Sequence, residues 1–332
     1  MWLDAEMDML VKPMDFQALR GLQSAFGERL QRDLPLARFT AARLGGPADI
    51  FLEVHTLDEL VQAASLLWQS GQAFTLLGGG SNLLVSDAGV RGVVLLNRAR
   101  QVRFDLDSSP PSVWAESGAN FGRLARQAAK KGLSGLEWAA GIPGTLGGAV
   151  VGNAGAHGGD MAGSLLLAEI LHHTGHMQIH RETWHVPEMG FAYRSSRLKR
   201  QPGQAVVLGA RLRLAHAEAS QIQARLDELV AYRRRTQPPG ASMGSMFKNP
   251  PGDFAGRLIE AAGLKGARRG QAQISDLHAN FFVNLGGASS QDVYELIRLA
   301  QDTVQARFGL RLELEIQLVG DWGAYQDSLE IG

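Results

Sequence analysis

Residues 77–84 read Leu-Gly-Gly-Gly-Ser-Asn-Leu-Leu and continue from an apolar stretch, 73–77, that predicts a β-strand. Consecutive glycines after a strand can turn several backbone N–H groups toward one point, which suits a pyrophosphate. Ser81 and Asn82 add side-chain donors. The G-x-G-x-x-G spacing fails at Leu83, and no Lys-Ser/Thr pair follows. The stretch therefore indicates a phosphate cradle that is neither a Rossmann fingerprint nor a P-loop, with a plain tight turn as the alternative.

A second glycine-rich stretch follows further along the chain. It reads Gly-Ile-Pro-Gly-Thr-Leu-Gly-Gly-Ala over 141–149 and Asn-Ala-Gly-Ala over 153–156. Small residues over such a length let a flat or extended ligand lie against the backbone, and Pro143 fixes part of the path. Two such stretches in one chain favour a long cofactor that spans two subdomains.

The bulk composition limits the classes of function. The chain has 332 residues, of which 45% are apolar and 20% are charged, and its 33 basic and 33 acidic residues cancel. This balance gives no bulk attraction to nucleic acid or to an anionic membrane. The absence of cysteine excludes disulfides, thiolate catalysis and thiolate metal sites. The acidic N-terminus and the lack of a run of about 18–20 apolar residues lead us to expect a cytoplasmic protein.

Apolar periodicity predicts the elements of the first two thirds of the chain. A strand at 50–54 is followed by a helix that begins at the capping pair Thr56 and Glu59 and ends at Gly71. We then expect strands at 73–77 and 93–96. Residues 101–215 are predicted to be mostly strands, with antiparallel strands at 165–179 and 205–214 and one helix from Asn120 to Gly132.

The last third predicts two helices and a strand. One helix covers 219–235, a second is capped by Ser290, and a strand covers 311–319. In that strand Leu312, Leu314, Ile316 and Leu318 alternate with polar residues. The predicted boundaries are an N-terminal helical leader at 1–35, a cofactor domain at 36–217 with subdomains at about 36–100 and 101–217, and a C-terminal domain at 218–325.

Several blocks of the sequence, taken in order, resemble the signature blocks of the UDP-N-acetylenolpyruvoylglucosamine reductases; they lie at 43–49, 77–87, 132–159, 191–197, 242–250, 255–266 and 278–284. The resemblance covers about 36–320, with a small departure at residues 39–42. It implies an α+β fold, with a two-part FAD-binding domain of the vanillyl-alcohol-oxidase (PCMH) type followed by a smaller α+β substrate-binding domain. It also implies non-covalent FAD, NADPH as co-substrate, a UDP-sugar substrate and a role in peptidoglycan synthesis, and hence in cell shape and division.

The resemblance also implies a set of FAD contacts. The first glycine stretch would hold the pyrophosphate, and the second would run along the flavin and its ribityl chain. The implied contacts are Arg43, Gly78, Gly79, Gly80, Ser81, Asn82, Gly118, Ala119, Gly141, Ile142, Pro143, Gly144, Thr145, Gly148, Asn153 and Gly155.

Three residues carry the implied chemistry. Ser245 lies in Gly244-Ser245-Met246-Phe247-Lys248-Asn249-Pro250, where the family has its proton donor. Arg194 lies in a Phe-x-Tyr-Arg-x-Ser block, where the family stabilises the developing enolate, and a guanidinium fork suits a carboxylate. Glu315 matches the catalytic Glu of the C-terminal strand, whereas the register disfavours Glu313. Taken alone, these residues would be interpreted as a turn, a surface residue and a solvated strand face.

Other polar residues have weaker assignments. Lys248 and Asn249 resemble positions at the sugar-nucleotide site, and Tyr193 and His278 are further substrate-binding candidates. At least two of the three arginines at 233–235 are expected merely to favour a helix C-terminus. His172, His173 and His176 flank a predicted Thr174-Gly175 turn without a partnering carboxylate pattern, so we expect no metal.

Two alternative functions remain open. Another FAD-linked oxidoreductase, such as a sugar or alcohol oxidase, could use the same scaffold, but such enzymes often tether the flavin through His or Cys. No Cys exists here, and the first glycine stretch holds no His. A catalytically dead sugar-nucleotide-binding protein would be expected to have lost Ser245, Arg194 or Glu315, and all three are present.

Overall fold

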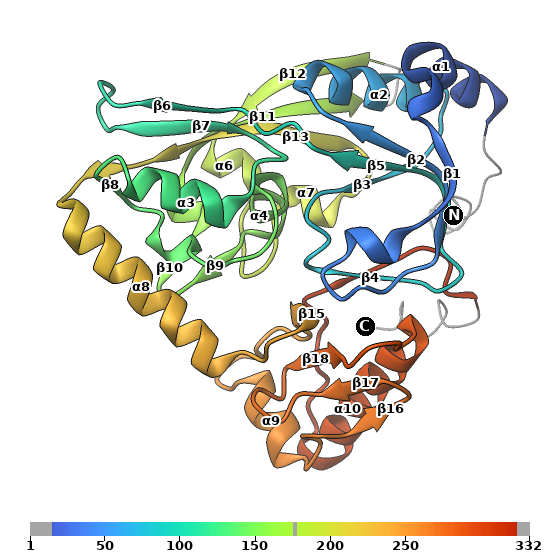
Figure 1. Ribbon diagram of the computed structural model, residues 1–332, viewed down its shortest axis with the longest axis vertical. Coiled ribbons are helices and arrows are strands. Elements are labelled where there is room, and N and C mark those ends of the chain that lie inside the picture. Colours follow the sequence, from blue (N-terminus) through green and yellow to red (C-terminus); the bar gives the residue numbers. More distant parts are fainter. Residues whose placement is uncertain (1–14, 175–177, 324–332) are drawn as a thin grey trace. The chain divides into compact units, whose positions relative to one another are not determined.

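The computed structural model describes residues 15–174 and 178–323, which form two compact units (Figure 1). Unit 1 comprises the chain up to Gln31, Ile50–Gly79 and Gly92–Tyr232. Unit 2 comprises Arg32–Asp49, Gly80–Arg91 and the chain from Arg233 onward. Segments of the N-terminal third thus belong alternately to unit 1 and to unit 2. The contiguous domain boundaries expected from the sequence stay a prediction.

The main sheet of unit 1 is antiparallel, with the strand order β12-β11-β13-β7-β6. Its strands are β6 (Val102–Asp105), β7 (Ser112–Glu116), β11 (Leu165–Thr174), β12 (Gln178–Trp184) and β13 (Ala205–Arg213). The predicted pairing of 165–179 with 205–214 is confirmed, with Ala168 opposite Ala210. The single strand expected at 165–179 was wrong, because β11 ends at Thr174 and β12 pairs back on it.

The central strands of this sheet contribute side chains to two cores, one on each face, because alternate side chains point to opposite sides. Ile170 enters one core with α3 (Phe121–Ala129), α4 (Leu146–Gly152) and α6 (Val186–Met189). Leu171 enters the other core with α1 (Phe16–Phe26) and α2 (Leu57–Gln69). Figure 1 shows these two sets of helices on opposite faces of the sheet. Unit 1 is therefore layered, with the glycine-rich helix α4 against β13.

A second sheet has the order β1-β2-β5-β3, formed by β1 (Gln31–Pro35), β2 (Pro47–Val54), β3 (Phe74–Leu77) and β5 (Val90–Asn97). β3 and β5 are parallel, with Leu77 opposite Leu96. The predicted helix between β2 and β3 is confirmed as α2, and the Thr56 side chain accepts the Glu59 N–H at 3.2 Å. The first glycine stretch begins where β3 ends.

Unit 2 contains a sheet with the order β15-β18-β17-β16, formed by β15 (Ala241–Ser245), β16 (Arg268–Arg269), β17 (Ala272–Ile274) and β18 (Phe281–Asn284). Its core also takes in α9 (Ala255–Ala261) and α10 (Ser290–Phe308). Ser289, not Ser290 as predicted, caps α10, and Ser290 Oγ donates to the Val85 carbonyl. The predicted strand 311–319 forms a ladder only as β19 (Gln317–Val319), parallel to β4 (Leu83–Val85), while Leu314 makes an isolated bridge to Phe247.

Several short elements and the predicted helix α8 complete the described chain. The sequence predicted one helix in 101–215, but several helices of four to seven residues also form there, too short to show a helical period. The remaining elements are η2 (Gly27–Arg29), η3 (Leu36–Phe39), η4 (Glu137–Ala139), α5 (Met161–Ser164), α7 (Arg197–Arg200), α8 (Ala219–Thr236), β8 (Leu133–Ser134), β9 (Gly155–Ala156), β10 (Gly159–Asp160) and β14 (Ala215–His216).

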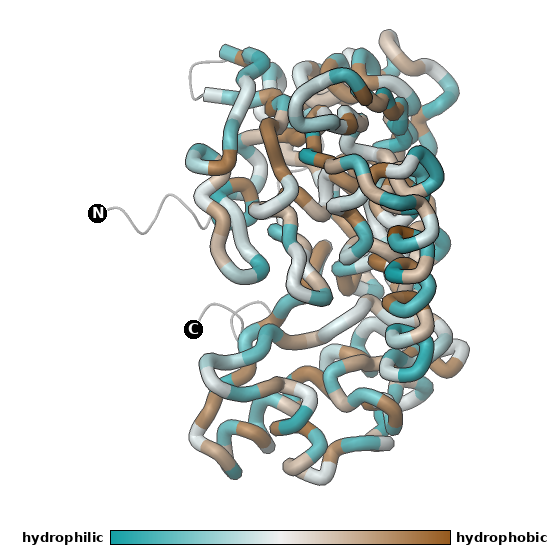
Figure 2. Tube along the Cα trace, turned by 90° about the vertical axis from the view of Figure 1, so that its left-hand side faces the viewer, coloured by the Kyte–Doolittle hydropathy of each residue, from teal (hydrophilic) through white to brown (hydrophobic). Residues whose placement is uncertain are grey.

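Figure 2 shows hydrophobic and hydrophilic stretches alternating along the traced chain. Among the described residues, no helix has both the length and the hydrophobicity that crossing a bilayer requires.

Candidate active site

The two glycine stretches meet in unit 1. A Cβ placed on Gly79 would lie 2.6 Å from the Gly144 Cα, and one on Gly78 would lie 2.5 Å from Thr145 Oγ1. Only glycine permits such an approach of two backbone segments. The contact brings the two stretches together backbone against backbone, so that one extended dinucleotide can lie along both. The residues present therefore fit the predicted FAD.

A third predicted segment joins this contact. The Leu146 N–H donates to the Ala119 carbonyl at 2.8 Å, and the Phe121 N–H donates to the Gly144 carbonyl at 3.1 Å. Gly118 is required as well, because a Cβ there would lie 2.4 Å from the Ala99 carbonyl oxygen. Thr145 caps α4 through the Gly148 N–H, at 3.4 Å. The structure thus brings together most of the residues expected to contact FAD in unit 1. Of the rest, residues 141–143 lead directly into Gly144, and Asn153 and Gly155 follow α4.

Arg194 lines a cavity of about 540 Å³ in unit 1. Its Nη1 donates to the Gly155 carbonyl at 2.7 Å, and its guanidinium lies 5.6 Å from the Tyr193 ring centre. The Asn153 side chain donates to the Ala192 carbonyl at 2.9 Å and so fastens the second glycine stretch to the loop before Arg194. Predicted FAD and substrate residues therefore share this cavity. Sequence reasoning missed Asp160 in its lining, for which the only signal was its closeness to the second glycine stretch.

Backbone strain marks the same positions. Five non-glycine residues of the described chain have positive φ: Asp33, Arg43, Asn153, His157 and Arg194. Such conformations cost energy, and they persist mainly where the surroundings impose them, often at functional sites. Arg43, Asn153 and Arg194 were all predicted from the resemblance as cofactor or catalytic residues. Asn153 is the left-handed C-cap of α4, a conformation that asparagine adopts readily, so the positive φ is unusual only at Arg43 and Arg194 among these three.

Ser245 and Glu315 lie on adjoining segments of unit 2. The Glu315 N–H donates to the Met246 carbonyl at 2.9 Å, and the Lys248 N–H donates to the Glu313 carbonyl at 2.8 Å. Ser245 ends β15 directly after Gly244, whose φ is 82°. Although 70 residues separate them in sequence (315 minus 245), the two predicted catalytic residues are thus fixed by one backbone network.

The part of the first glycine stretch that belongs to unit 2 is tied to the same network. The Asn82 side chain donates to the Glu315 carbonyl at 3.1 Å, and the Gln317 N–H donates to the Asn82 carbonyl at 3.0 Å. Gly80, one residue before Ser81, accepts the Ala41 N–H at 2.8 Å, two residues before Arg43. Cofactor candidates and Glu315 therefore belong to one framework.

The other substrate candidates have local partners in unit 2. Lys248 forms an ion pair with Glu313, and the Asn249 side chain accepts the Ala255 N–H at the start of α9, at 3.1 Å. His278 Nδ1 accepts the Asn280 N–H at 3.2 Å, and burial lowers the pKa of its imidazole. Their roles in substrate binding, like that of Tyr193, stay predictions. The arginines at 233–235 occupy the last turn of α8, as the helix-terminus interpretation expects.

Comparison with known proteins decides the family. The family model "FAD binding domain" matches residues 48–178, and "UDP-N-acetylenolpyruvoylglucosamine reductase, C-terminal domain" matches 236–319. The reductase of Chloroflexus aggregans is 44% identical over 87% of this chain and 97% of its own length; that of Rubrobacter xylanophilus is 45% identical over 87% and 95%. The chain belongs to the UDP-N-acetylenolpyruvoylglucosamine reductase family.

A solved structure of the family agrees with the fold. The reductase of Thermus caldophilus is 39% identical to this chain and matches it with a TM-score of 0.73, over 88% of this chain and 99% of its own. The predicted resemblance, the α+β fold class and the FAD cofactor are thereby confirmed. The FAD and catalytic residues were assigned from the resemblance to this family. Membership of the family is now shown, but the role of each residue stays a proposal.

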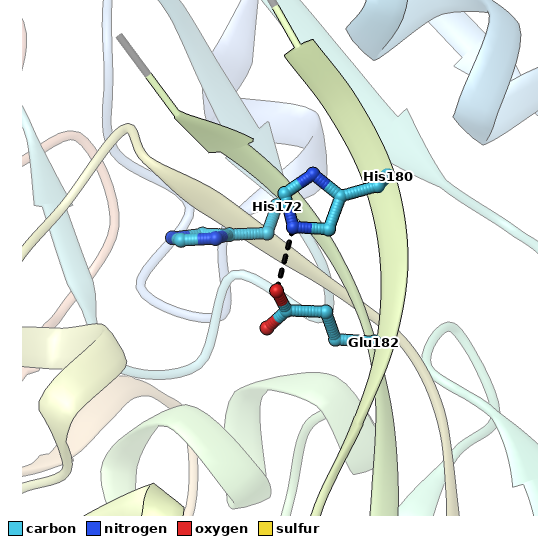
Figure 3. Close-up of side chains that lie close together, drawn as sticks. All are labelled: His172, His180 and Glu182. Carbon is cyan, nitrogen blue, oxygen red and sulfur yellow. Dashed lines mark hydrogen bonds and ion pairs between the residues drawn. The ribbon is translucent and has the colours of Figure 1, made fainter.

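A histidine cluster lies outside this site, and the sequence pattern pointed to only one of its three residues, His172. His172, His180 and Glu182 place ligand atoms within 4.8 Å of one another (Figure 3). Glu182 is the carboxylate that the sequence pattern did not reveal, because antiparallel pairing of β11 and β12 brings it beside His172. His173 instead stacks on Trp68, with 5.6 Å between ring centres, and His176 lies outside the described residues.

The cluster is built as a hydrogen-bonded group. His180 Nε2 lies 2.6 Å from Glu182 Oε1, and Trp184 Nε1 donates to the other carboxylate oxygen at 2.7 Å, which lowers the pKa of Glu182. Two ligands of one tetrahedral zinc ion, with bonds of about 2.0–2.2 Å, would lie roughly 3.3–3.5 Å apart. Binding a metal would therefore require this pair to open. The expected absence of a metal stays a prediction.

Proposed function

We propose that the chain reduces the enolpyruvyl group of UDP-N-acetylenolpyruvoylglucosamine to the lactyl ether of UDP-N-acetylmuramate, with NADPH as reductant and non-covalent FAD. The observation that carries the proposal is the fixed relation between Ser245 and Glu315 in a member of this family. The Glu315 N–H bonds to the carbonyl of the residue after Ser245, so the two backbone segments that carry the serine and the carboxylate adjoin, as the proposed reaction needs.

The protein's own residues have defined tasks in this reaction. When bound, FAD supplies the redox chemistry by carrying a hydride from NADPH to C3 of the enolpyruvyl group. Gly78, Gly79 and Gly144 hold the cofactor against bare backbone. The Arg194 guanidinium offers paired donors to the substrate carboxylate, where negative charge grows as C3 accepts the hydride.

Ser245 completes the reaction by giving its hydroxyl proton to C2, so that one hydride and one proton are added across the double bond. A serine hydroxyl is a weak acid, so it needs a fixed position and polarising neighbours. We assign the third catalytic position to Glu315, whose N–H is bonded to the residue after Ser245.

We further propose that the enzyme acts in the cytoplasm, without an obligatory protein partner. The zero formal net charge supports this, because it gives no bulk attraction to an anionic membrane. The UDP-sugar and NADPH are the only partners that the reaction itself requires.

The test measures flavin reduction and flavin reoxidation separately in the wild-type protein and in Ser245→Ala. The purified protein is expected to be yellow, to bleach with NADPH without oxygen, and to regain its colour when the enolpyruvyl substrate is added. In Ser245→Ala, bleaching should be unchanged, while reoxidation by substrate should slow by about 10²–10⁴-fold, the usual contribution of a general acid. Ser242→Ala on the same strand is the control.

Two results would contradict these assignments. Unchanged reoxidation in Ser245→Ala would remove Ser245 as the proton donor. A bleached wild-type protein that the enolpyruvyl substrate fails to reoxidise would refute the proposed reaction. Bleaching of the oxidised, yellow protein by a sugar or an alcohol would favour the oxidase alternative.

A further inference from the structure

Asn280 lies in the block 278–284, in which the resemblance assigned a role only to His278, and it contacts the Ser245 segment. It is a buried residue, 3% exposed, directly before β18. Its side-chain oxygen accepts the Phe247 N–H at 2.9 Å, and its side-chain nitrogen donates to the Phe247 carbonyl at 2.8 Å. Its own carbonyl accepts the Met246 N–H at 2.8 Å. One amide side chain therefore satisfies both backbone groups of a fully buried residue.

These hydrogen bonds lie where the sheet becomes irregular. β15 pairs with β18 at Ser242, shifts register, and pairs again only at Ser245, opposite Phe281. Gly244, in the left-handed region, lies inside this shift. Beyond Ser245 the regular ladder stops, and the Asn280 side chain takes the place of a strand partner for Phe247. Ser245 is thus bounded by a glycine distortion on one side and by this amide clamp on the other.

The opposite edge of the same segment contacts the segment that contains Glu315. The Met246 carbonyl accepts the Glu315 N–H, and Phe247 bridges to Leu314. The short stretch after Ser245 is therefore held from two sides, by Asn280 and by the segment of the other predicted catalytic residue. Without the Asn280 amide, the Phe247 N–H and carbonyl would remain buried without these partners, and the segment would have to move to recover them.

We propose that Asn280 is a positioning residue for the proton donor: its side-chain amide fixes the Phe247 backbone so that the Ser245 hydroxyl is held in place relative to Glu315. The inference rests on the proposed function, because it assigns Asn280 to the proton-delivering half of that reaction. Small displacements suffice, since a shift of about 1 Å in a reacting group can slow a reaction by about 10²-fold. NADPH oxidation needs no proton from Ser245, so the clamp has no part in flavin reduction.

The experiment compares Asn280→Leu with Gln273→Leu in the FAD-loaded enzyme. Gln273 is the matched control, because it is a buried amide of the same unit, 8% exposed, whose side chain bonds to Gly266 and Asp276 instead. Flavin reduction by NADPH and reoxidation by the enolpyruvyl substrate are followed separately. For Asn280→Leu we expect reoxidation to slow by at least about tenfold and reduction to change by less than about twofold. Gln273→Leu should affect neither beyond twofold.

A double-mutant cycle then tests whether Asn280 acts through Ser245. When Asn280→Leu is added to Ser245→Ala, reoxidation should slow by less than about threefold further, because the group to be positioned is already gone. Full additivity would overturn the proposal, and so would equal loss of both half-reactions in Asn280→Leu, which indicates general structural damage.

A second variant guards against failure to fold. Asn280→Asp keeps the shape of the side chain and an acceptor for the Phe247 N–H but replaces the donor to the Phe247 carbonyl by an oxygen, so its reoxidation rate should fall below that of wild type. A wild-type reoxidation rate in this variant would overturn the proposal as well. If the wild-type enzyme itself fails to be reoxidised by the substrate, the proposed function fails rather than the clamp.

Discussion

Replacing Gly79 with alanine tests the contact between the two glycine stretches. The new Cβ would lie 2.6 Å from the Gly144 Cα, 0.8 Å short of the 3.4 Å at which ordinary contact begins. Both atoms belong to backbone, so neither can rotate away, and one segment must shift. Overpacking of this kind costs about 1–3 kcal/mol of folding free energy. Because the same surface is proposed to hold FAD, the shift should also weaken cofactor binding.

Gly152→Ala is the matched control for this prediction. Gly152 ends α4, has nothing within 4 Å of an added Cβ, and is not in the left-handed region, so alanine there should be neutral or stabilise by about 0.4–1 kcal/mol. The assay is FAD content after purification together with the thermal midpoint. We expect Gly79→Ala to lose FAD and melt lower by at least about 2 °C, and Gly152→Ala to do neither. An FAD content and midpoint equal to wild type in Gly79→Ala would refute the contact.

Two further predictions concern stability. Arg29 lowers the pKa of Glu59 to about 2, from 4.5, so this pair stabilises the fold above pH 4.5 and the contribution is lost as the pH falls toward 2. Glu59→Gln should therefore cost no more than about 1 kcal/mol at pH 7, since the pair is partly exposed. In urea unfolding, its deficit relative to wild type should shrink below pH 4.5; a constant deficit from pH 7 to pH 3 would contradict this origin. Asp87 accepts the Ser290 and Gln291 N–H groups at 2.9 Å each, so Asp87→Ala should lower unfolding free energy by about 0.5–2 kcal/mol, and an unchanged thermal midpoint would argue against this capping role.

Local patterns predicted the fold better than the long-range contacts. The Thr56 cap and the apolar stripe of α2 depend only on residues within one helix, so they could be predicted directly. The strand at 311–319 illustrates the limit. Its alternation is real, with Leu312 and Ile316 buried, but Leu314 only bridges to Phe247 because the chain there meets the Ser245 segment rather than a regular strand. Alternation reports which side chains are buried, and it does not report which backbone is available as a partner.

The candidate site likewise has residues that the sequence could predict and features that only the structure shows. The resemblance assigned Arg43 and Arg194 by their order along the chain, yet an arginine carries no sign that its backbone has positive φ. Asn280 shows the converse: its amide is chemically ordinary, and its importance arises only because β18 begins beside a distorted end of β15. A motif can name the group that donates the proton. The side chain that holds this group in place does so through hydrogen bonds to backbone. Any asparagine could make such bonds, so only the fold shows which asparagine makes them. Residues such as Asn280 are therefore found by following the backbone partners of a catalytic segment, where the unsatisfied groups of an irregular strand require a side chain to complete them.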